Sequence, residues 1–294
     1  MVRKFAPEFE SVKQSPCWPC CEVGHEHAIA LARELSNQLI REANVTKYHV
    51  HGLFGIFADG DRINYEAVGK VRPPFGRMVT ENYEHAKTRF IYSRLCALSQ
   101  SHKIETVCEI GFNAGLSAIL LLEAAQSARV LSFDLADFPW ARRADQLMRA
   151  RFSRSRFPGV VFGDSHKTLD QQARQEEGGT LRCDAAFIDG AKTYTGRLQH
   201  IADLRRFARP GTRVFLDEVT SYACVSGELN DTEHLRQCRD INRGYYPSTR
   251  AYSHAVNQGH MRILECAWPS RLVDKDGVCV AELLGNRTRR DDVT

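Results

Sequence analysis

Acidic residues stand at regular intervals in the middle of the chain, each directly after a short apolar run. They are Asp134, Asp164, Asp189 and Asp217, and Glu109 lies within an earlier apolar run. A helix N-cap is enough to explain any one of them. Four in succession gather negative charge at one place, which stability alone does not favour. The pattern therefore indicates a site for a ligand that is cationic or rich in hydrogen-bond donors.

A strand, a glycine turn and a helix surround the first of these acids. Residues 106–110 predict the strand, 111–115 the turn and 116–128 the helix, and α/β proteins use this arrangement to cradle nucleotide-like ligands. The glycines are equally explained by a turn that needs them for steric reasons alone. Asp134 follows Glu109 at close to the spacing at which an acid meets ribose hydroxyls. Because no phosphate-binding lysine follows the glycines, S-adenosylmethionine fits better than ATP.

The elements that must position these residues alternate between strands and helices from residue 80 onward. Apolar runs predict strands at 106–110, 129–133, 160–162, 183–188, 212–216, 261–267 and 278–284. Helical spacing predicts helices at 80–98, 116–128, 141–151, 194–207 and 228–242, with a further helix that ends near 177. The last two strands form a hairpin. The pattern predicts an α/β fold, a Rossmann-like seven-stranded, mostly parallel sheet with a C-terminal antiparallel hairpin.

Three segments organise the chain. Residues 1–75 are expected to form an N-terminal extension or cap, with a helix at 28–42 and a hairpin at 49–65. Residues 76–285 form the main domain, and 286–294 a charged tail. The cap would close over a substrate and shield it from water.

Composition narrows the function classes. The chain has 294 residues, a net charge of +4, 43% hydrophobic and 26% charged residues, which is the composition expected of a soluble globular protein. So mild a charge argues against a dedicated nucleic-acid partner, and no apolar run reaches the roughly 20 residues that span a membrane. The sequence leaves room for a homodimer.

The ten cysteines do not by themselves imply disulfides. Cys108 and Cys183 lie in apolar runs and are expected to be small core residues, so a cytoplasmic, reducing location is the simpler interpretation. The Cys17-x-x-Cys20 pair, followed by His25, is either a zinc site or a turn with incidental thiols. Asn-x-Thr sequences leave a glycosylated, secreted chain as the alternative location.

The segment from Glu105 to Val219 resembles class I S-adenosylmethionine-dependent methyltransferases, most closely the catechol and caffeoyl-CoA O-methyltransferase group. The matching pieces are Glu109-Ile-Gly-Phe-Asn-Ala-Gly-Leu-Ser117, Phe133-Asp134, Gly163-Asp-Ser165, Phe187-Ile-Asp-Gly-Ala-Lys-Thr-Tyr194 and Pro210-Gly-Thr-Arg-Val-Phe-Leu-Asp-Glu218. The terminal hairpin fits that family's closing strands. The resemblance implies methyl transfer to the oxygen of a small-molecule hydroxyl.

The resemblance also implies roles for single residues. The cofactor-binding positions would be Glu109, Gly111, Asn113, Gly115, Ser117, Asp134, Asp164, Ser165 and Asp189. Metal-dependent members hold Mg²⁺ at positions that match Asp189, Asp217 and Glu218, and use a lysine base at the position of Lys192. Glu218 replaces the usual Asn or Asp, which leaves the metal in question. A metal-free acid pair at 217–218 and a surface lysine at 192 are the alternatives.

Two further functions stay open. The first keeps the cofactor and changes the acceptor to a protein or RNA, steered by a group of basic residues: Arg142, Arg143, Arg149, Arg151, Arg154 and Arg156. The second is a methyltransferase fold without catalysis that serves as a binding partner. Failure to bind the cofactor would support this second function.

Overall fold

The computed structural model describes residues 18–42, 81–138, 140–176, 181–219, 225, 246–267 and 277–285. The helices are α2 (Trp18–Glu42), α4 (Glu81–Ser101), α5 (Leu116–Ala124), α6 (Ala141–Arg151), α7 (Ser165–Gln175), α8 (Tyr194–Phe207) and α11 (Tyr246–Asn257). The strands are β1 (Thr106–Ile110), β2 (Arg129–Asp134), β3 (Val160–Phe162), β4 (Cys183–Ile188), β5 (Ala208–Val219), β6 (Met261–Ala267) and β7 (Gly277–Leu283).

The strands form one seven-stranded sheet in the order β3-β2-β1-β4-β5-β7-β6. Strands β3, β2, β1, β4 and β5 run parallel, whereas β7 is antiparallel to both β5 and β6. The strand order reverses between β1 and β4, and such a switch point opens a crevice at the carboxyl ends of the strands. The predicted Rossmann-like sheet with its antiparallel C-terminal hairpin is confirmed.

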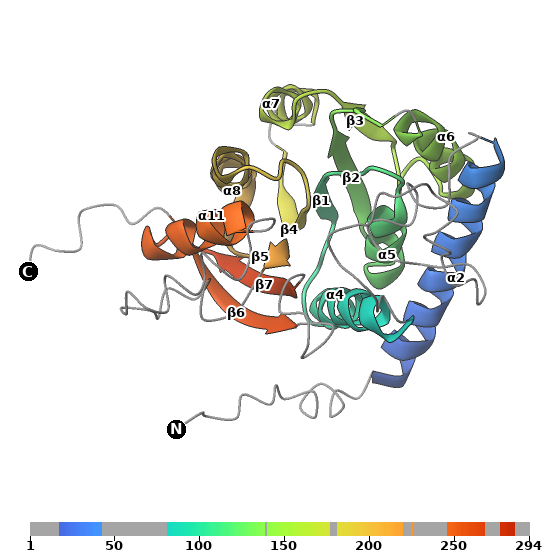
Figure 1. Ribbon diagram of the computed structural model, residues 1–294, viewed down its shortest axis with the longest axis horizontal. Helices are drawn as coiled ribbons and strands as arrows, with labels where there is room; N and C mark the ends of the chain where they lie inside the picture. The colour runs from blue at the N-terminus through green and yellow to red at the C-terminus, as the bar shows by residue number, and fades with distance from the viewer. Residues whose placement is uncertain are drawn as a thin grey trace, which may run out of the picture.

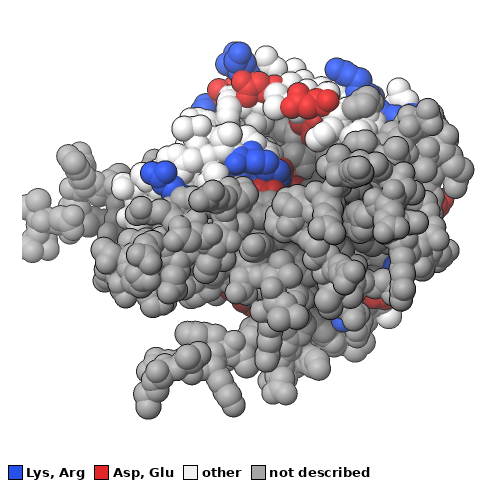
Figure 2. All heavy atoms as spheres, in the orientation of Figure 1, with Lys and Arg blue, Asp and Glu red and all other residues white. Residues whose placement is uncertain are grey.

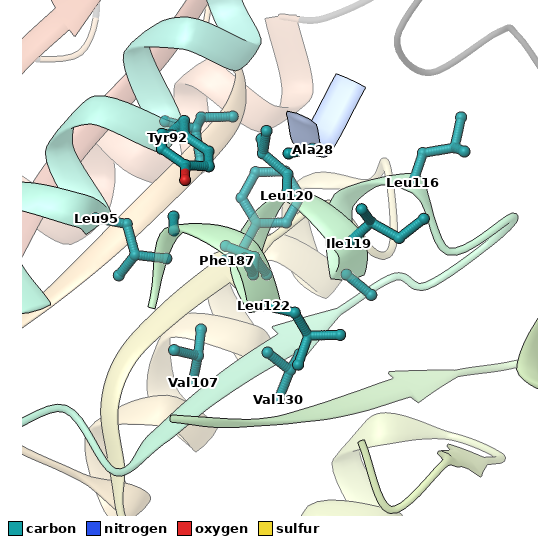
Figure 3. Packing of buried hydrophobic residues seen from close by; sticks show 14 of the residues in the cluster. Ala28, Tyr92, Leu95, Val107, Leu116, Ile119, Leu120, Leu122, Val130 and Phe187 are labelled. Atoms are coloured by element: carbon teal, nitrogen blue, oxygen red, sulfur yellow. The ribbon is translucent and has the colours of Figure 1, made fainter. Parts of the chain in front are cut away.

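Helices cover both faces of the sheet (Figure 1). One hydrophobic cluster joins α2, α4, α5 and α6 to one face, and a second joins α7, α8 and α11 to the other. Helix α5 is buried on nearly every side because it lies between the strands and the outer helices α2 and α4. Figure 3 shows this packing, with Ile119 and Leu122 of α5 above Val107 of β1 and Val130 of β2. Burying each such aliphatic side chain contributes about 1.5–3 kcal/mol.

The N-terminal helix belongs to this core. Helix α2 begins at Trp18, ten positions before the predicted start at residue 28, and its Ala28, Leu35 and Leu39 pack in the same cluster as α5. This part of the expected cap therefore covers α5. The remainder of the expected cap, the predicted hairpin at 49–65, and the predicted helix at 228–242 lie outside the described residues, while α11 follows without a sequence prediction.

Three disulfides among the described residues correct the expectation of free core thiols. Cys108 of β1 is joined to Cys183 of β4, and Cys21 of α2 is joined to Cys96 of α4. A third disulfide, Cys266–Cys279, links β6 to β7. The predicted burial of Cys108 and Cys183 is confirmed, but pattern analysis could not pair them because their partners come from separate elements. None of the helices in the described ranges combines the length and apolar character needed to cross a membrane.

Candidate active site

The glycine turn lies at the switch point between β1 and β4. Gly111 has φ +100°, and a Cβ placed there would lie 2.6 Å from the backbone oxygen of Asp189. Gly115, with φ +80°, forms the N-cap of α5, and a Cβ there would lie 2.8 Å from the Phe112 ring. Glycine adopts these positive φ angles and close approaches without steric cost. The turn therefore brings backbone close to backbone where the crevice opens.

Glu109 stabilises the glycine turn through hydrogen bonds to the two neighbouring elements. Its side chain is fully buried and accepts hydrogen bonds from the hydroxyls of Ser117 on α5 and Ser132 on β2, the latter at 2.5 Å. Burial raises the pKa of Glu109 to about 7, although the two serine hydroxyls oppose the shift. Glu109 and Ser117, both expected at the cofactor, bond to each other, so Glu109 positions the start of α5.

Asp134 holds the turn from the neighbouring strand. Its carboxylate accepts hydrogen bonds from the backbone N–H groups of Phe112 and Asn113, each at 2.9 Å, and of Ala136 at 2.7 Å. The Asn113 side-chain oxygen accepts a 2.6 Å hydrogen bond from the Trp140 indole. A carboxylate has about four acceptor positions, so three internal bonds leave Asp134 room for a ribose hydroxyl.

Asp164 and Ser165 mark the carboxyl end of β3. Asp164 is the N-cap of α7 and accepts a hydrogen bond from the backbone N–H of His166 at 3.1 Å. The Ser165 hydroxyl is 3.2 Å from Nε2 of His200, a buried residue of α8. Burial lowers the pKa of His200 to about 3, so its imidazole is neutral. Among the residues that the structure describes, its Nδ1 has no hydrogen-bond partner, and no sequence pattern predicted a role for this residue.

Three carboxylates gather at the ends of β4 and β5. They belong to Asp189, Asp217 and Glu218, all of which are buried. Neighbouring residues of a strand normally point to opposite faces, but β5 shifts its register against β7 between Leu216 and Val219, and Glu218 adopts φ +62°. Such strained backbone clusters at functional sites. The Glu218 backbone N–H also donates to the Asp217 carboxylate at 2.8 Å. Asp189 and Glu218 share contacts with Lys192 and Arg197, and Asp217 adjoins Glu218 through that backbone hydrogen bond.

Each of these carboxylates is paired with a cation of the chain itself. Lys87 of α4 pairs with Asp217, and Lys192 pairs with Asp189 and, at 3.0 Å, with Glu218. Arg197 of α8, which is fully buried, lies 2.9 Å from Glu218 and 3.5 Å from Asp189. Three carboxyl groups thus face three cations, and burial raises the pKa of Asp189 to about 7 although Lys192 opposes the shift.

This arrangement does not fit the expected Mg²⁺ site. Within the described ranges, no group of three or more His, Cys, Asp or Glu side chains could hold a metal ion. A metal ion at these carboxylates would have to displace Lys87 or Arg197, both of which are buried. The displaced cation would lose its partner, and leaving a buried charge unpaired costs about 3–5 kcal/mol.

The same ion pairs change the expected role of Lys192. Desolvation alone would lower the pKa of its ammonium, but the carboxylates of Asp189 and Glu218 raise it above the ordinary value. A general base must be deprotonated when it accepts a proton, so this environment disfavours that role. The side chain is 49% exposed, whereas Lys87 is 5% exposed and Arg197 is fully buried. Lys192 is the member of this cation group that a ligand can reach.

The fold and the sequence family agree on the class of protein. Residues 108–219 match the protein family described as a methyltransferase domain, and this segment runs from β1 through β5. This match agrees with the resemblance to methyltransferases that the sequence motifs predict. A search among curated proteins finds no match to the chain.

Solved structures with a similar fold include methyltransferases with bound cofactor. The O-methyltransferase from Bacillus cereus in complex with SAH is 19% identical, with TM-score 0.46, over 66% of this chain and 80% of that one. Cofactor-bound Rv0187 from MTB is 18% identical, with TM-score 0.49, over 88% and 90%. The O-methyltransferase TomG from Streptomyces achromogenes, in complex with SAM, is 15% identical, with TM-score 0.47, over 75% and 95%.

Proposed function

We propose that this protein is an S-adenosylmethionine-dependent methyltransferase that methylates a hydroxyl oxygen of a small molecule. One observation carries the proposal. The family-matched segment ends its parallel strands in carboxylates around a glycine turn at the switch point of the sheet. Ligands of open α/β sheets bind at this point. A group of strand ends rich in acceptor oxygens suits the ribose hydroxyls of S-adenosylmethionine.

Different residues at the carboxyl ends of the parallel strands would bind different parts of the cofactor. The backbone of the turn at Gly111 would meet the methionine part of the cofactor, and Asp134 its ribose. Ser165 stands where the adenine would lie, with neutral His200 fixed behind it. When bound, the cofactor supplies a methyl group on a positively charged sulfur. The chain's own contribution is to hold that sulfur in line with the acceptor, and such positioning accounts for much of a transfer rate.

Lys192 is the group that would meet the acceptor. The Lys192 side chain is half-exposed. Its ammonium could donate a hydrogen bond to the acceptor oxygen and stabilise the negative charge that develops on that oxygen while the hydroxyl proton passes to solvent water. Asp189 and Glu218 hold the ammonium in place. We propose this electrostatic role for Lys192 in place of the base that the family resemblance implied.

A small-molecule acceptor is favoured over a polyanion by the contacts of the arginine group. Arg149 pairs with Asp145, Arg151 pairs with Glu34, and Arg156 donates to backbone oxygens of the core. These side chains serve the fold. On the face shown in Figure 2, the described Lys and Arg atoms lie beside Asp and Glu atoms and do not gather into one basic patch.

Calorimetric titration with S-adenosylhomocysteine tests the cofactor site. We expect micromolar binding, about −8 kcal/mol, with and without EDTA, and much weaker binding of ATP. Asp134→Ala should weaken the binding about tenfold or more, because it loses a charged hydrogen-bond acceptor. Asp137→Ala, which changes an exposed acid of the same loop, is the matched control. A folded protein that fails to bind S-adenosylhomocysteine would point to a non-catalytic binding function.

We further propose that the chain folds in an oxidising compartment, although the sequence alone favours the cytosol. The support is the set of disulfides Cys21–Cys96, Cys108–Cys183 and Cys266–Cys279. Disulfides persist in oxidising compartments and are rare in the reducing cytosol.

A further inference from the structure

Lys87 comes from outside the part of the chain that carries the methyltransferase motifs. It lies on α4, ahead of the family-matched residues 108–219. Its ammonium nevertheless contacts the Asp217 carboxylate at the end of β5, and both side chains are about 95% buried, with 5% and 4% exposed. The pair connects α4 to the rim formed by the carboxylates of Asp189, Asp217 and Glu218, at which the family resemblance implies a divalent cation.

Several contacts hold this connection in place. Helix α4 packs against α2 and α5 in the large hydrophobic cluster, and Arg94 of α4 forms an ion pair with Glu265 of β6. The Asp217 oxygen that pairs with Lys87 also accepts the Glu218 backbone N–H. Lys87 therefore holds Asp217, and the Asp217 carboxylate in turn accepts a hydrogen bond from the backbone of Glu218, which has a left-handed conformation.

We propose that Lys87 is a built-in replacement for a divalent metal ion at this rim, assisted by Arg197. The two buried cations neutralise carboxylates that would otherwise bind a metal, and they close the site to it. Lys87 is in this sense a positioning residue, because it fixes Asp217 and contacts no reacting atom. This inference rests on the proposed function only in so far as the rim is the catalytic site.

A metal-free rim restricts the acceptor. A divalent ion favours acceptors that offer two neighbouring oxygens, because both can enter its coordination shell. The ammonium of Lys192 is a single compact cation and is the exposed member of the group. The acceptor class that fits is a molecule with a single reacting hydroxyl, and adjacent hydroxyl groups are not required.

Metal titration of the full-length protein tests the proposal. We would remove metals with EDTA, dialyse, and titrate MnCl₂ by calorimetry into the wild type, Lys87→Ala and Lys103→Ala. Lys103 is the matched control, because it pairs with Glu105 while 85% exposed. We expect no saturable Mn²⁺ binding in the wild type or in Lys103→Ala. Lys87→Ala should bind one Mn²⁺ at least tenfold more tightly than the wild type does, because the Asp217 carboxylate has lost its cation.

Three results would overturn the proposal. One is a wild-type protein that binds Mn²⁺ below about 10 µM at a site that Asp217→Asn removes. Another is equal absence of binding in folded wild type and folded Lys87→Ala. The third is Mn²⁺ binding in Lys87→Ala that survives the further change Asp217→Asn. If Lys87→Ala does not fold, Lys87→Gln takes its place, and the wild-type titration still decides the first result.

A parallel titration with S-adenosylhomocysteine separates this inference from the proposed function. If the wild type binds neither the cofactor product nor Mn²⁺ but Lys87→Ala gains Mn²⁺, the proposed function fails and the metal replacement stands. If the wild type binds both, the cofactor site stands and the metal replacement fails.

Discussion

Glu109→Gln should remove a pH dependence of folding stability. Glu109 has a folded-state pKa of about 7, raised by burial, and its ordinary value is 4.5. Between these two values the folded state binds a proton that the unfolded state has already released. Stability therefore falls as pH rises through this window and levels off above pH 7. Each pKa unit corresponds to about 1.4 kcal/mol, so the loss amounts to about 3 kcal/mol.

Urea unfolding at pH 5, 6, 7 and 8 would measure this loss. Glutamine carries no charge at any of these values, and its amide can still bond to the hydroxyls of Ser117 and Ser132. We expect the variant and the wild type to agree near pH 5, and the variant to be more stable by up to about 3 kcal/mol at pH 8. Glu105→Gln, an exposed acid just before the same strand, is the control. Equal pH slopes in wild type and Glu109→Gln would refute the reasoning, because they would show that the buried carboxyl titrates as it does in water.

Two more predictions follow from the ion pairs and the disulfides. Lys192→Ala should leave the Kd for S-adenosylhomocysteine within about threefold and slow turnover of an accepted hydroxyl substrate about a hundredfold; an unchanged turnover would rule out the role proposed for its ammonium. Reduction with dithiothreitol should lower the melting temperature, because Cys21–Cys96 and Cys108–Cys183 each span 75 positions, worth about 4 kcal/mol each in chain entropy. Alkylation of the unreduced, denatured protein would count the free thiols, and full labelling of all ten cysteines would contradict the pairing.

The site combines features that a local pattern can reveal with features that it cannot. Carboxylates at successive strand ends are local facts of the sequence, and the sheet topology brings them together because parallel strands present their carboxyl ends at one edge. Of the three cations that pair with Asp189, Asp217 and Glu218, Lys192 is close in sequence to Asp189, whereas Lys87 and Arg197 come from α4 and α8. Which way a helix turns its lysine or arginine depends on how that helix packs.

Cysteine pairing shows the same limit. Cys108 and Cys183 were predicted to be buried because each lies in an apolar run, and they are buried. They can form a disulfide because β1 and β4 are neighbours in the sheet, and a disulfide requires the Cα and Cβ atoms of its two cysteines to lie within specific distances. For this reason we propose an oxidising compartment in place of the reducing cytosol that the sequence alone favours.

The sequence by itself determined the strands, their order of succession and the glycine turn. Strand bounds at 106–110, 160–162, 183–188 and 261–267 agree with the structure, because short apolar runs between turns have few other ways to be buried. Only the tertiary structure decided that Glu109 supports the turn, that Glu218 takes a left-handed backbone, and that Lys87 reaches Asp217. Each of these features depends on how the helices and strands pack against one another, which no local spacing encodes.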